Sequence, residues 1–238
     1  TTLYYTNLLN VSPQNIDLAD RDIFILSKGH AAVAQFTILA DQKFFDKKFL
    51  KSFNHEGSFL GGHPDRGTPG IETDSGSLGH GLAIAAGIAL ASKIDNIDNH
   101  IITIIGDGEC YEGSVWETLL FANQNMLDNF IIILDRNNQL ALSFTEDCNK
   151  LEPLSDKFKS FGFDCYEIDG HDHREIYETI SKLKGKKDKK PKLVLANTIK
   201  GKGISFMERT LKWHHGLPNE EEKIIALSEL EKEIKKYD

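Results

Sequence analysis

Cysteine is scarce in this sequence, and its few copies lack the spacing of a disulfide framework or a zinc site. The chain has three cysteines among 238 residues, and none of them forms a Cys-x-x-Cys pair. An odd number of unclustered cysteines is typical of proteins from a reducing compartment. We therefore expect Cys110, Cys148 and Cys165 to be free thiols and the protein to be cytoplasmic.

Long apolar runs and a positive net charge are also missing. The longest apolar candidate, 82–91, is far shorter than the roughly 18 residues that span a membrane. Lys and Arg number 28 against 36 Asp and Glu, a formal charge of 28 − 36 = −8. This balance disfavours binding to a nucleic-acid backbone. We expect no membrane partner, no nucleic-acid partner, no signal peptide and no internal repeat.

Positive charge is concentrated in one short stretch. Residues 182–192 hold seven Lys and one Asp, or +6, so the rest of the chain carries −8 − 6 = −14. No aromatic residue lies between these lysines, which weakens a nucleic-acid interpretation. The stretch is predicted to be a solvated surface loop between a helix and a strand.

Apolar runs alternate with helical patterns along the chain. This order predicts an α/β fold, in which helices cover both faces of a parallel sheet. A Gly- and Pro-rich segment at 54–76 is too long for an ordinary connection and is expected to be functional. Asp172 and Asn219 are predicted N-caps. The predicted strands are 22–26, 101–105, 130–134, 163–168 and 193–196, and the predicted helices are 30–40, 78–93, 112–126, 174–183 and 219–238.

Polar residues follow two of these strands, where ligands of parallel sheets bind. Asp107 stands inside Gly106-Asp-Gly108, and Asn137 follows the next strand at 137 − 107 = 30 positions further on. The glycines permit close approach of a phosphate, but the acid would repel it unless a divalent cation lies between them. A hard cation prefers oxygen donors. The sequence therefore predicts Asp107, Asn137 and the carbonyl of Gln139 as metal ligands, the alternative being two ordinary turns.

These residues belong to a series of motifs that resembles the transketolases. The resemblance covers essentially the whole chain, and it implies that residues 1–238 are the diphosphate-binding domain, encoded as the N-terminal subunit of a split transketolase. The Ser-Gly-His-Pro segment that transketolases carry upstream is absent from this sequence. The motifs are Leu-Ser-Lys-Gly-His at 26–30, Gly-His-Pro at 62–64, Gly-Ser-Leu-Gly-His-Gly at 76–81, Gly-Asp-Gly-x-x-x-Glu-Gly at 106–113, Lys-Gly-Lys-Gly at 200–203 and Trp-His-His-Gly at 213–216.

The resemblance also implies roles for single residues. It implies thiamin diphosphate as the cofactor, with Mg²⁺, or Ca²⁺ or Mn²⁺ in its place. Catalytic roles are implied for His30, His63, His215 and Glu112, the last in a carboxylate network between subunits. Cofactor contacts are implied for Gly76, Leu78, Gly106, Asp107, Gly108, Glu109, Asn137, His30 and His215.

Four other histidines are weaker candidates. His214 is less well placed than its neighbour, and His80 stands where transketolases usually carry Gln. His171 and His173 could suggest zinc, but no third ligand is placed, so a loop or helix cap is favoured.

A transketolase moves a two-carbon ketol unit from a ketose to an aldose. The implied enzyme is a transferase acting on sugar phosphates in pentose phosphate carbohydrate metabolism. A separate pyrimidine-domain subunit is implied as the partner, in an α₂β₂ heteromer, because it supplies a glutamate that activates the cofactor. Three alternatives stay open: a specialised sugar transketolase, a 1-deoxyxylulose-5-phosphate-synthase-like enzyme, and a non-catalytic scaffold subunit.

Overall fold

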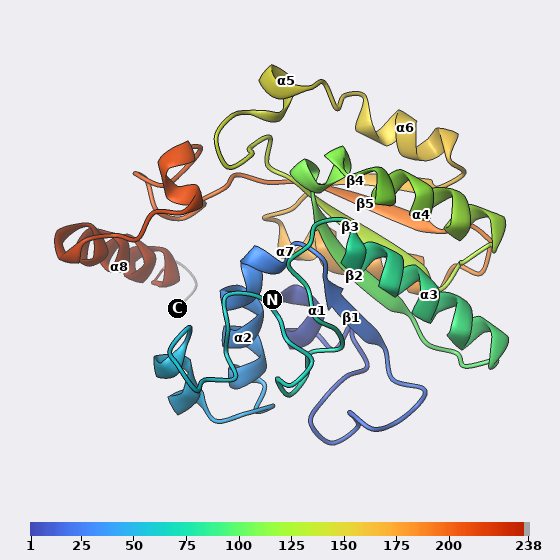
Figure 1. Cartoon of the computed structure of the whole chain (residues 1–238), viewed down its shortest axis with the longest axis horizontal. Coiled ribbons are helices and arrows are strands. Elements are labelled where there is room, and N and C mark those ends of the chain that lie inside the picture. The colour runs from blue at the N-terminus through green and yellow to red at the C-terminus, as the bar shows by residue number, and fades with distance from the viewer. Residues whose placement is uncertain (236–238) are drawn as a thin grey trace.

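The computed structural model describes residues 1–235 and contains one parallel sheet with helices on both faces (Figure 1). The strand order is β1-β2-β3-β5-β4, and all four pairings are parallel. The predicted α/β fold is confirmed. The strands are β1 (Ile23–Leu26), β2 (Ile101–Gly106), β3 (Phe130–Arg136), β4 (Asp164–Asp169) and β5 (Lys192–Asn197).

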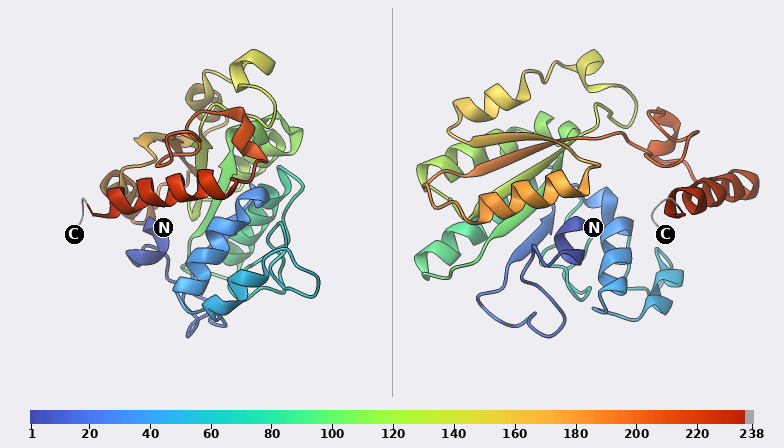
Figure 2. Two further views of the ribbon diagram at one scale, coloured as in Figure 1. Left: turned by 90° about the vertical axis from the view of Figure 1, so that its left-hand side faces the viewer. Right: turned by 180° about the vertical axis from the view of Figure 1, so that it is seen from behind.

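Two apolar cores lie on opposite faces of the sheet, because successive strand residues point to opposite sides. Ile101 and Ile105 of β2 belong to one core, and Ile102 belongs to the other. Both faces are therefore covered, as Figures 1 and 2 show. The first core packs under α3 (His80–Ile94), α4 (Gly113–Gln124) and α6 (Leu154–Ser160), and the second under α1 (Thr2–Tyr5), α2 (Ala32–Asp41) and α7 (His173–Lys184).

Small residues let α3 lie close to the sheet. Ala85, Ala86 and Ala89 are completely buried beneath it. A Cβ on Gly81 would stand 2.8 Å from the Cα of Ser27, so this glycine permits the approach of α3 to the end of β1. Because of this contact, the loop before α3 lies at the carboxyl edge of the sheet.

The predicted helix caps are present. The Asp172 carboxylate accepts from the N–H groups of Arg174 and Glu175 at the start of α7. Asn219 and Glu222 form a capping box at the start of α8 (Glu220–Ile234), which the sequence predicted over 219–238. Residues 236–238 lie outside the described residues.

Several short elements were not predicted. They are α1, α5 (Thr145–Cys148), α6 and the 3-10 turns η1 (Gly29–Ala31), η2 (Lys47–Ser52), η3 (Asp107–Tyr111) and η4 (Leu211–His214). The turn η3 separates β2 from α4, so α4 begins at Gly113.

The Lys-rich segment 182–192 is the predicted surface loop in its middle, where Lys187, Lys189 and Lys190 are exposed, but its two ends differ from the prediction. Its first lysines lie in the last turn of α7, where Lys184 pairs with the buried Asp22. Its last residue, Lys192, opens β5 and is fully buried, with Nζ donating to the carbonyls of Asp128 at 2.7 Å and Lys190 at 3.0 Å. Specific acceptors hold these side chains, so the segment joins the helix and the strand to the body of the protein.

Cys110, Cys148 and Cys165 are all free thiols, as predicted. Within residues 1–235, no helix combines the length and the apolar composition that crossing a membrane would require.

Candidate functional site

The carboxyl ends of β1, β2, β3 and β5 meet at one edge of the sheet. Gly106 is paired with Asp135, and Asp135 is paired with Ala196. The backbone N–H of Asn138 donates to the Asp107 carboxylate at 2.6 Å, which joins the two predicted strand ends. The predicted convergence of these residues is therefore confirmed.

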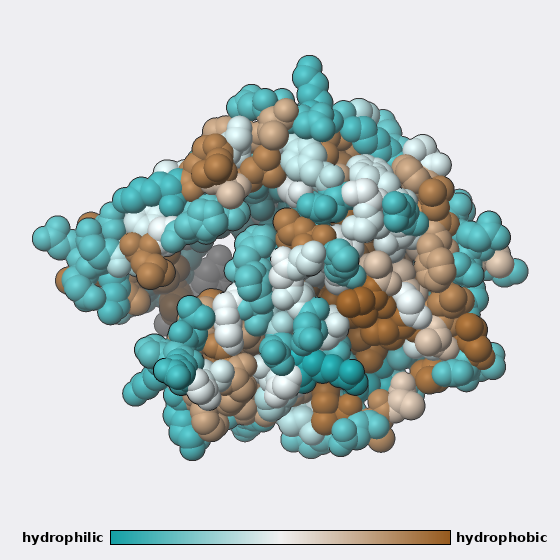
Figure 3. Space-filling model, in the orientation of Figure 1, coloured by the Kyte–Doolittle hydropathy of each residue, from teal (hydrophilic) through white to brown (hydrophobic). Residues whose placement is uncertain are grey.

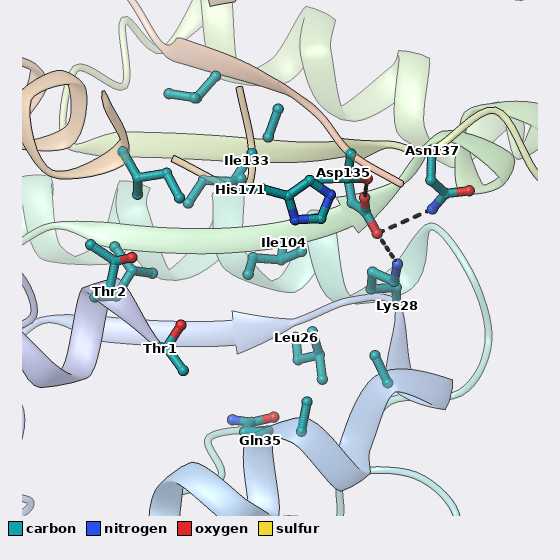
Figure 4. Close-up of a pocket in the computed structure, with 18 of the residues that line it drawn as sticks. Thr1, Thr2, Leu26, Lys28, Gln35, Ile104, Ile133, Asp135, Asn137 and His171 are labelled. Carbon is teal, nitrogen blue, oxygen red and sulfur yellow. Dashed lines mark hydrogen bonds and ion pairs between the residues drawn. The ribbon is translucent and has the colours of Figure 1, made fainter. Parts of the chain in front are cut away.

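A cavity of about 590 Å³ opens at this edge, on the face that carries α2 and α7 (Figure 4). This volume lies within the range of roughly 300–1,000 Å³ that is usual for ligand pockets. Apolar strand residues, among them Leu26, Ile104 and Ile133, form its wall. Its polar end is formed by Lys28, His30, Asp135, Asn137, Lys200 and His214.

Asp107 is almost fully buried beside this polar end, with 1% of its surface exposed. One carboxylate oxygen accepts from the Gly108 N–H at 2.8 Å, and the other accepts from Asn138 and from the Arg136 guanidinium at 3.1 Å. Burial raises the pKa of Asp107 above its usual value, although the bonds from Asn138 and Arg136 act in the opposite direction. A bound cation would favour the ionised form of this carboxylate.

The donors beside Asp107 suit a hard cation. The side-chain oxygen of Asn137 accepts from the Gln139 N–H at 3.0 Å, so the loop folds back toward the predicted ligands. Both polar atoms of the Gln139 side chain are buried without a hydrogen-bond partner among the described residues. Carboxylate, amide and carbonyl oxygens are the ligands that Mg²⁺ and Ca²⁺ prefer. These residues fit the predicted metal.

At Gly108 only a glycine fits without a shift of its neighbour, because an added Cβ would stand 2.7 Å from the side chain of Leu140 in the loop after β3. Gly106 ends β2 and faces the Lys28 side chain, whose tip lies about 4.0 Å from the position of an added Cβ. The backbone at Gly106 is therefore open to close approach, whereas Gly108 permits the contact between η3 and the loop after β3.

Two lysines give the cavity a cationic end, where two histidines stack and Lys28 is paired with Asp135. The rings of His30 and His214 lie 5.4 Å apart, and Lys200 Nζ donates to His214 Nδ1. Burial, followed by the charge of Lys28, lowers the pKa of His30 to about 4. Burial, followed by the charge of Lys200, lowers the pKa of His214 to about 4. Both rings are therefore neutral at pH 7, and an anion bound there would raise both pKa values.

The structure places His214 in the cavity lining, whereas the motif Trp-His-His-Gly led to the prediction of its neighbour, His215. The turn η4 ends at His214 and directs its ring against His30. His215 is exposed, and its ring contacts His214 from outside the cavity lining described for residues 1–235. Two adjacent histidines cannot be told apart by motif alone, because the turn decides which ring points inward.

His63 lies in the Gly- and Pro-rich loop, next to a smaller hollow of about 440 Å³. The ring is exposed, and a Cβ on Gly76 would lie 3.4 Å from it. Gly76 in turn lies against Gly29, the residue before His30. The predicted residues His63, Gly76 and His30 are therefore neighbours, and Leu78 follows in the same loop, half-buried.

The two predicted glutamates differ in their surroundings. Glu109 is 1% exposed, and its carboxylate accepts from the Ser27 hydroxyl and from the N–H groups of Gly79 at 2.8 Å and Gly106 at 3.2 Å. It joins β1, β2 and α3 inside the protein, so the structure gives it internal partners in place of the predicted cofactor contact. Glu112 is exposed at the start of α4, beside Gly79.

The remaining histidines make local contacts. His171 Nε2 accepts from the Ile199 N–H at 2.7 Å, and His173 Nδ1 lies 2.7 Å from the Thr2 hydroxyl. Within residues 1–235 no three His, Cys, Asp or Glu side chains cluster as a metal site, in keeping with the loop and cap interpretation of His171 and His173. His80 is exposed as the first residue of α3.

Four polar residues of the site were not predicted from the sequence. Lys28 and Lys200 stand inside quoted motifs, so their position in those motifs was an available signal. Arg136 ends β3 and Thr198 follows β5. Neither residue stands in a distinctive sequence motif, so only the fold brings them to the site. Arg136 binds Asp107, Thr145, Glu146 and Glu152, and Thr198 donates to Asp135.

Comparison with known proteins gives a consistent result. Residues 1–231 match the family model described as transketolase, thiamine diphosphate binding domain. The chain is 41% identical to one subunit of the apulose-4-phosphate transketolase of Actinobacillus succinogenes, over 98% of this chain and 84% of that protein. It is 42% identical to the 6-deoxy-6-sulfo-D-fructose transketolase subunit SqwG of Clostridium sp. strain MSTE9, over 96% of this chain and 83% of that protein.

Among solved structures, the chain is similar to the transketolase of Campylobacter jejuni. The TM-score is 0.86, the identity is 33%, and the match covers 96% of this chain and 37% of that one. A transketolase from Leishmania mexicana matches with a TM-score of 0.78 and 25% identity. The chain therefore spans about two fifths of the length of the solved proteins that it matches.

Proposed function

This chain belongs to the transketolase thiamine diphosphate-binding domain family, and from that premise we propose that it is the cofactor-binding subunit of a two-subunit ketol transferase. The observation that carries the proposal is the junction of oxygen donors and a cationic cavity end at the carboxyl edge of the sheet. A metal ion and a diphosphate need these two features side by side.

The proposal assigns this chain's residues to two groups. Asp107, Asn137 and the Gln139 carbonyl would hold Mg²⁺, and Gly106 would leave room for the phosphates. The cavity end would take the negative charge of the diphosphate. Its residues are Lys28, His30, Lys200 and His214, and His214 takes the place predicted for His215.

Thiamin diphosphate, when bound, supplies a carbanion that attacks a carbonyl and an electron sink that stabilises the product of that attack. The protein must then move protons and bind sugar hydroxyls. His30, neutral at pH 7, can accept a proton at a ring nitrogen. We assign hydroxyl recognition to His63, because its loop lies away from the predicted metal ligands and against His30 through Gly76.

The relatives favour a specialised substrate over a general pentose phosphate enzyme. Two of them are named for apulose 4-phosphate and for 6-deoxy-6-sulfo-D-fructose. Both names describe sugars with an anionic group. We propose a ketose with a terminal phosphate or sulfonate as the donor.

We also propose that a second subunit covers the exposed side of α3 and α4. Two relatives are themselves named as single subunits of a transketolase, which supports a partner. Apolar residues gather over this side of the molecule (Figure 3), and Ile84, Leu120 and Phe121 are 39%, 61% and 40% exposed there. Glu112 lies at the N-terminal end of α4, where we propose the carboxylate network between subunits. An α₂β₂ assembly is the arrangement that we propose.

The test of metal-bridged binding uses Asp107→Asn. This change keeps the side-chain volume and removes the charge, so the buried Arg136 loses its ion pair with Asp107 but keeps Glu146 and Glu152. We expect the affinity for thiamin diphosphate with Mg²⁺, measured by titration calorimetry, to fall more than about 100-fold, beyond the range for outer-sphere residues. EDTA should produce a similar loss in the unaltered protein.

Asp156→Asn serves as the matched control, because Asp156 is 68% exposed on α6. Circular dichroism and a cooperative melt must show that both variants fold. Undiminished affinity of a folded Asp107→Asn protein would contradict the proposed metal site.

A further inference from the structure

We propose that Asp135 is a positioning residue that fixes the orientation of the Asn137 amide, so that Asn137 presents its oxygen to the metal. This inference rests on the proposed function and adds to it, since Asp135 itself is assigned no contact with the metal. Figure 4 shows the arrangement: Lys28 and Asn137 both point to the Asp135 carboxylate.

Three donors converge on the Asp135 carboxylate. Asn137 Nδ2 donates to Oδ2 at 3.2 Å, and Lys28 Nζ donates to the same oxygen. The Thr198 hydroxyl donates to Oδ1. Both oxygens are therefore held, and the carboxylate cannot rotate without breaking one of these bonds.

The three donors come from three different strand ends. Lys28 follows β1, Asn137 follows β3 and Thr198 follows β5. Asp135 lies on β3 between Gly106 of β2 and Ala196 of β5 in the sheet register. The sheet thus fixes the position of the carboxylate, and the side chain of Asn137 is fixed in turn.

The chemistry of the acceptor decides which way the amide faces. An ionised carboxylate accepts hydrogen bonds and cannot donate them, so only the NH₂ end of the Asn137 amide can face it. The oxygen must then face the opposite way, where one lone pair accepts from the Gln139 N–H. An amide oxygen has two lone pairs, and the second remains for a cation.

The alternative orientation would direct the NH₂ group toward the metal. A flipped amide would also bring its oxygen against the carboxylate, where the two oxygens would repel each other. Outer partners of a metal ligand typically change metal affinity or activity by 10- to 100-fold when they are removed.

The experiment compares two substitutions of the same residue. Asp135→Ala removes the acceptor and frees the Asn137 amide to turn. Asp135→Asn keeps a carbonyl oxygen that Asn137 Nδ2 can still reach, but removes the charge. We measure the Mn²⁺ dissociation constant by electron paramagnetic resonance on the full chain, with thiamin diphosphate present in excess.

We expect Asp135→Ala to weaken Mn²⁺ binding by roughly 10- to 100-fold and Asp135→Asn to stay within about threefold of the unaltered protein. Equal losses in the two variants would mean that charge and not orientation matters, and this would overturn the proposal. Unchanged binding in Asp135→Ala would overturn it as well. If Asp135→Ala does not fold, Thr198→Val is tested in its place, because it removes a donor from the same carboxylate. Weaker Mn²⁺ binding by Thr198→Val would support the proposal, and unchanged Mn²⁺ binding would overturn it.

Asp164→Ala is the matched control. Asp164 also binds a lysine, Lys186, and a hydroxyl, that of Tyr166, but it lies at the start of β4, at the opposite edge of the sheet. The Mn²⁺ affinity of the Asp164→Ala protein should equal that of the unaltered protein. If the unaltered protein itself fails to bind Mn²⁺ with thiamin diphosphate, the proposed function fails, and this result is distinct from failure of the positioning inference.

Discussion

The acidic residues of the site differ in what their oxygens bind. Glu109 and Asp135 are fully engaged by donors of the protein, so they hold the strand ends in place. Asp107 is also held by three donors, but one of them is the N–H of Asn138, which stands between Asn137 and Gln139 with its unpartnered amide. A single carboxylate with neutral oxygen neighbours is a donor set that a divalent cation would complete.

His63 provides the first test at the residue scale. Replacing it with Ala in the enzyme reconstituted with its partner should lower kcat/KM for the ketose by roughly tenfold to ten-thousandfold, the range for loss of one acid–base or hydrogen-bonding group. Cofactor affinity should change little, because the loop of His63 contributes none of the proposed metal ligands. Steady-state kinetics beside a cofactor titration measures both effects. A large loss of cofactor affinity with a normal kcat would show that His63 serves the cofactor.

The stacked histidines make stability depend on pH. The pKa values of His30 and His214 are lowered to about 4 from an ordinary value of 6.5, so the unfolded chain binds more protons than the folded chain between these limits. The free energy of unfolding should therefore fall as the pH decreases from about 6.5 toward 4. Urea unfolding between pH 7 and 5 measures this slope.

A single substitution should reduce the slope by roughly half. His214→Gln removes one of the two rings whose pKa is lowered, so the slope should be smaller than in the unaltered protein. A slope in His214→Gln equal to that of the unaltered protein would mean that other groups cause the pH dependence.

At the scale of elements, the position of α3 depends on Gly81. A Cβ there would stand 2.8 Å from the Ser27 backbone, so Gly81→Ala should cost about 1–3 kcal/mol of stability through overpacking. Gly87 in the same helix has open space, with no described atom within 4 Å of an added Cβ, and Gly87→Ala should gain about 1 kcal/mol. Chemical denaturation of both variants gives the difference. Equal effects would show that α3 can move away from β1 without cost.

Strands β2, β3 and β5 could be predicted because each is a short, dense apolar run that is largely buried, whereas the edge strand β4 is mostly polar and only Ile168 in it is buried. The caps Asp172 and Asn219 could be predicted because the side chain itself makes the cap. The helices α5 and α6 could not, since four and seven residues are too few to display a helical period. The prediction for the Lys-rich segment holds for its exposed middle but not for its ends, because composition shows charge but not the acceptors, such as the Asp128 carbonyl, that hold the buried Lys192.

The site residues that stand directly after strands could be predicted from the sequence. The site residues whose position depends on the conformation of a turn could not. Asp107 and Asn137 were found because parallel strands bring their carboxyl ends together. The choice between His214 and His215 depends on where the 3-10 turn η4 ends, which no local pattern records. The role of Asp135 required side-chain contacts between three strand ends, and these are visible only in the folded chain.

At the scale of the whole molecule, the cavity and the exposed apolar face lie on different sides of the sheet. The cavity opens on the α2 and α7 side, and Ile84, Leu120 and Phe121 are exposed on the α3 and α4 side. The helix α8 lies at one end of the molecule, beyond α2 (Figures 1 and 2). A partner that covers α3 and α4 must therefore also extend over the carboxyl edge of the sheet, where the cavity opens, to bring its glutamate to the cofactor.

Partner dependence is the prediction at this scale. The purified chain should show no ketol transfer from xylulose 5-phosphate or from a sulfonated ketose, because the glutamate that activates the cofactor in transketolases belongs to the pyrimidine domain. Adding the partner subunit should restore turnover, measured as release of the aldose product. Robust turnover by the isolated chain would refute the assignment to a split enzyme.

A substitution on the exposed face of α4 tests where the partner binds. Leu120→Asp places a charge on a side chain that is 61% exposed, so the isolated chain should fold with little change in stability. Buried in an interface, the same carboxylate would lose its hydration without gaining a partner, which costs several kcal/mol. We therefore expect turnover by the mixed subunits to fall at least tenfold, with recovery at higher partner concentration. Leu18→Asp, a matched change at a side chain that is 56% exposed in the segment before β1, should support normal turnover. Full activity of Leu120→Asp at low partner concentration would place the partner on another face of the protein.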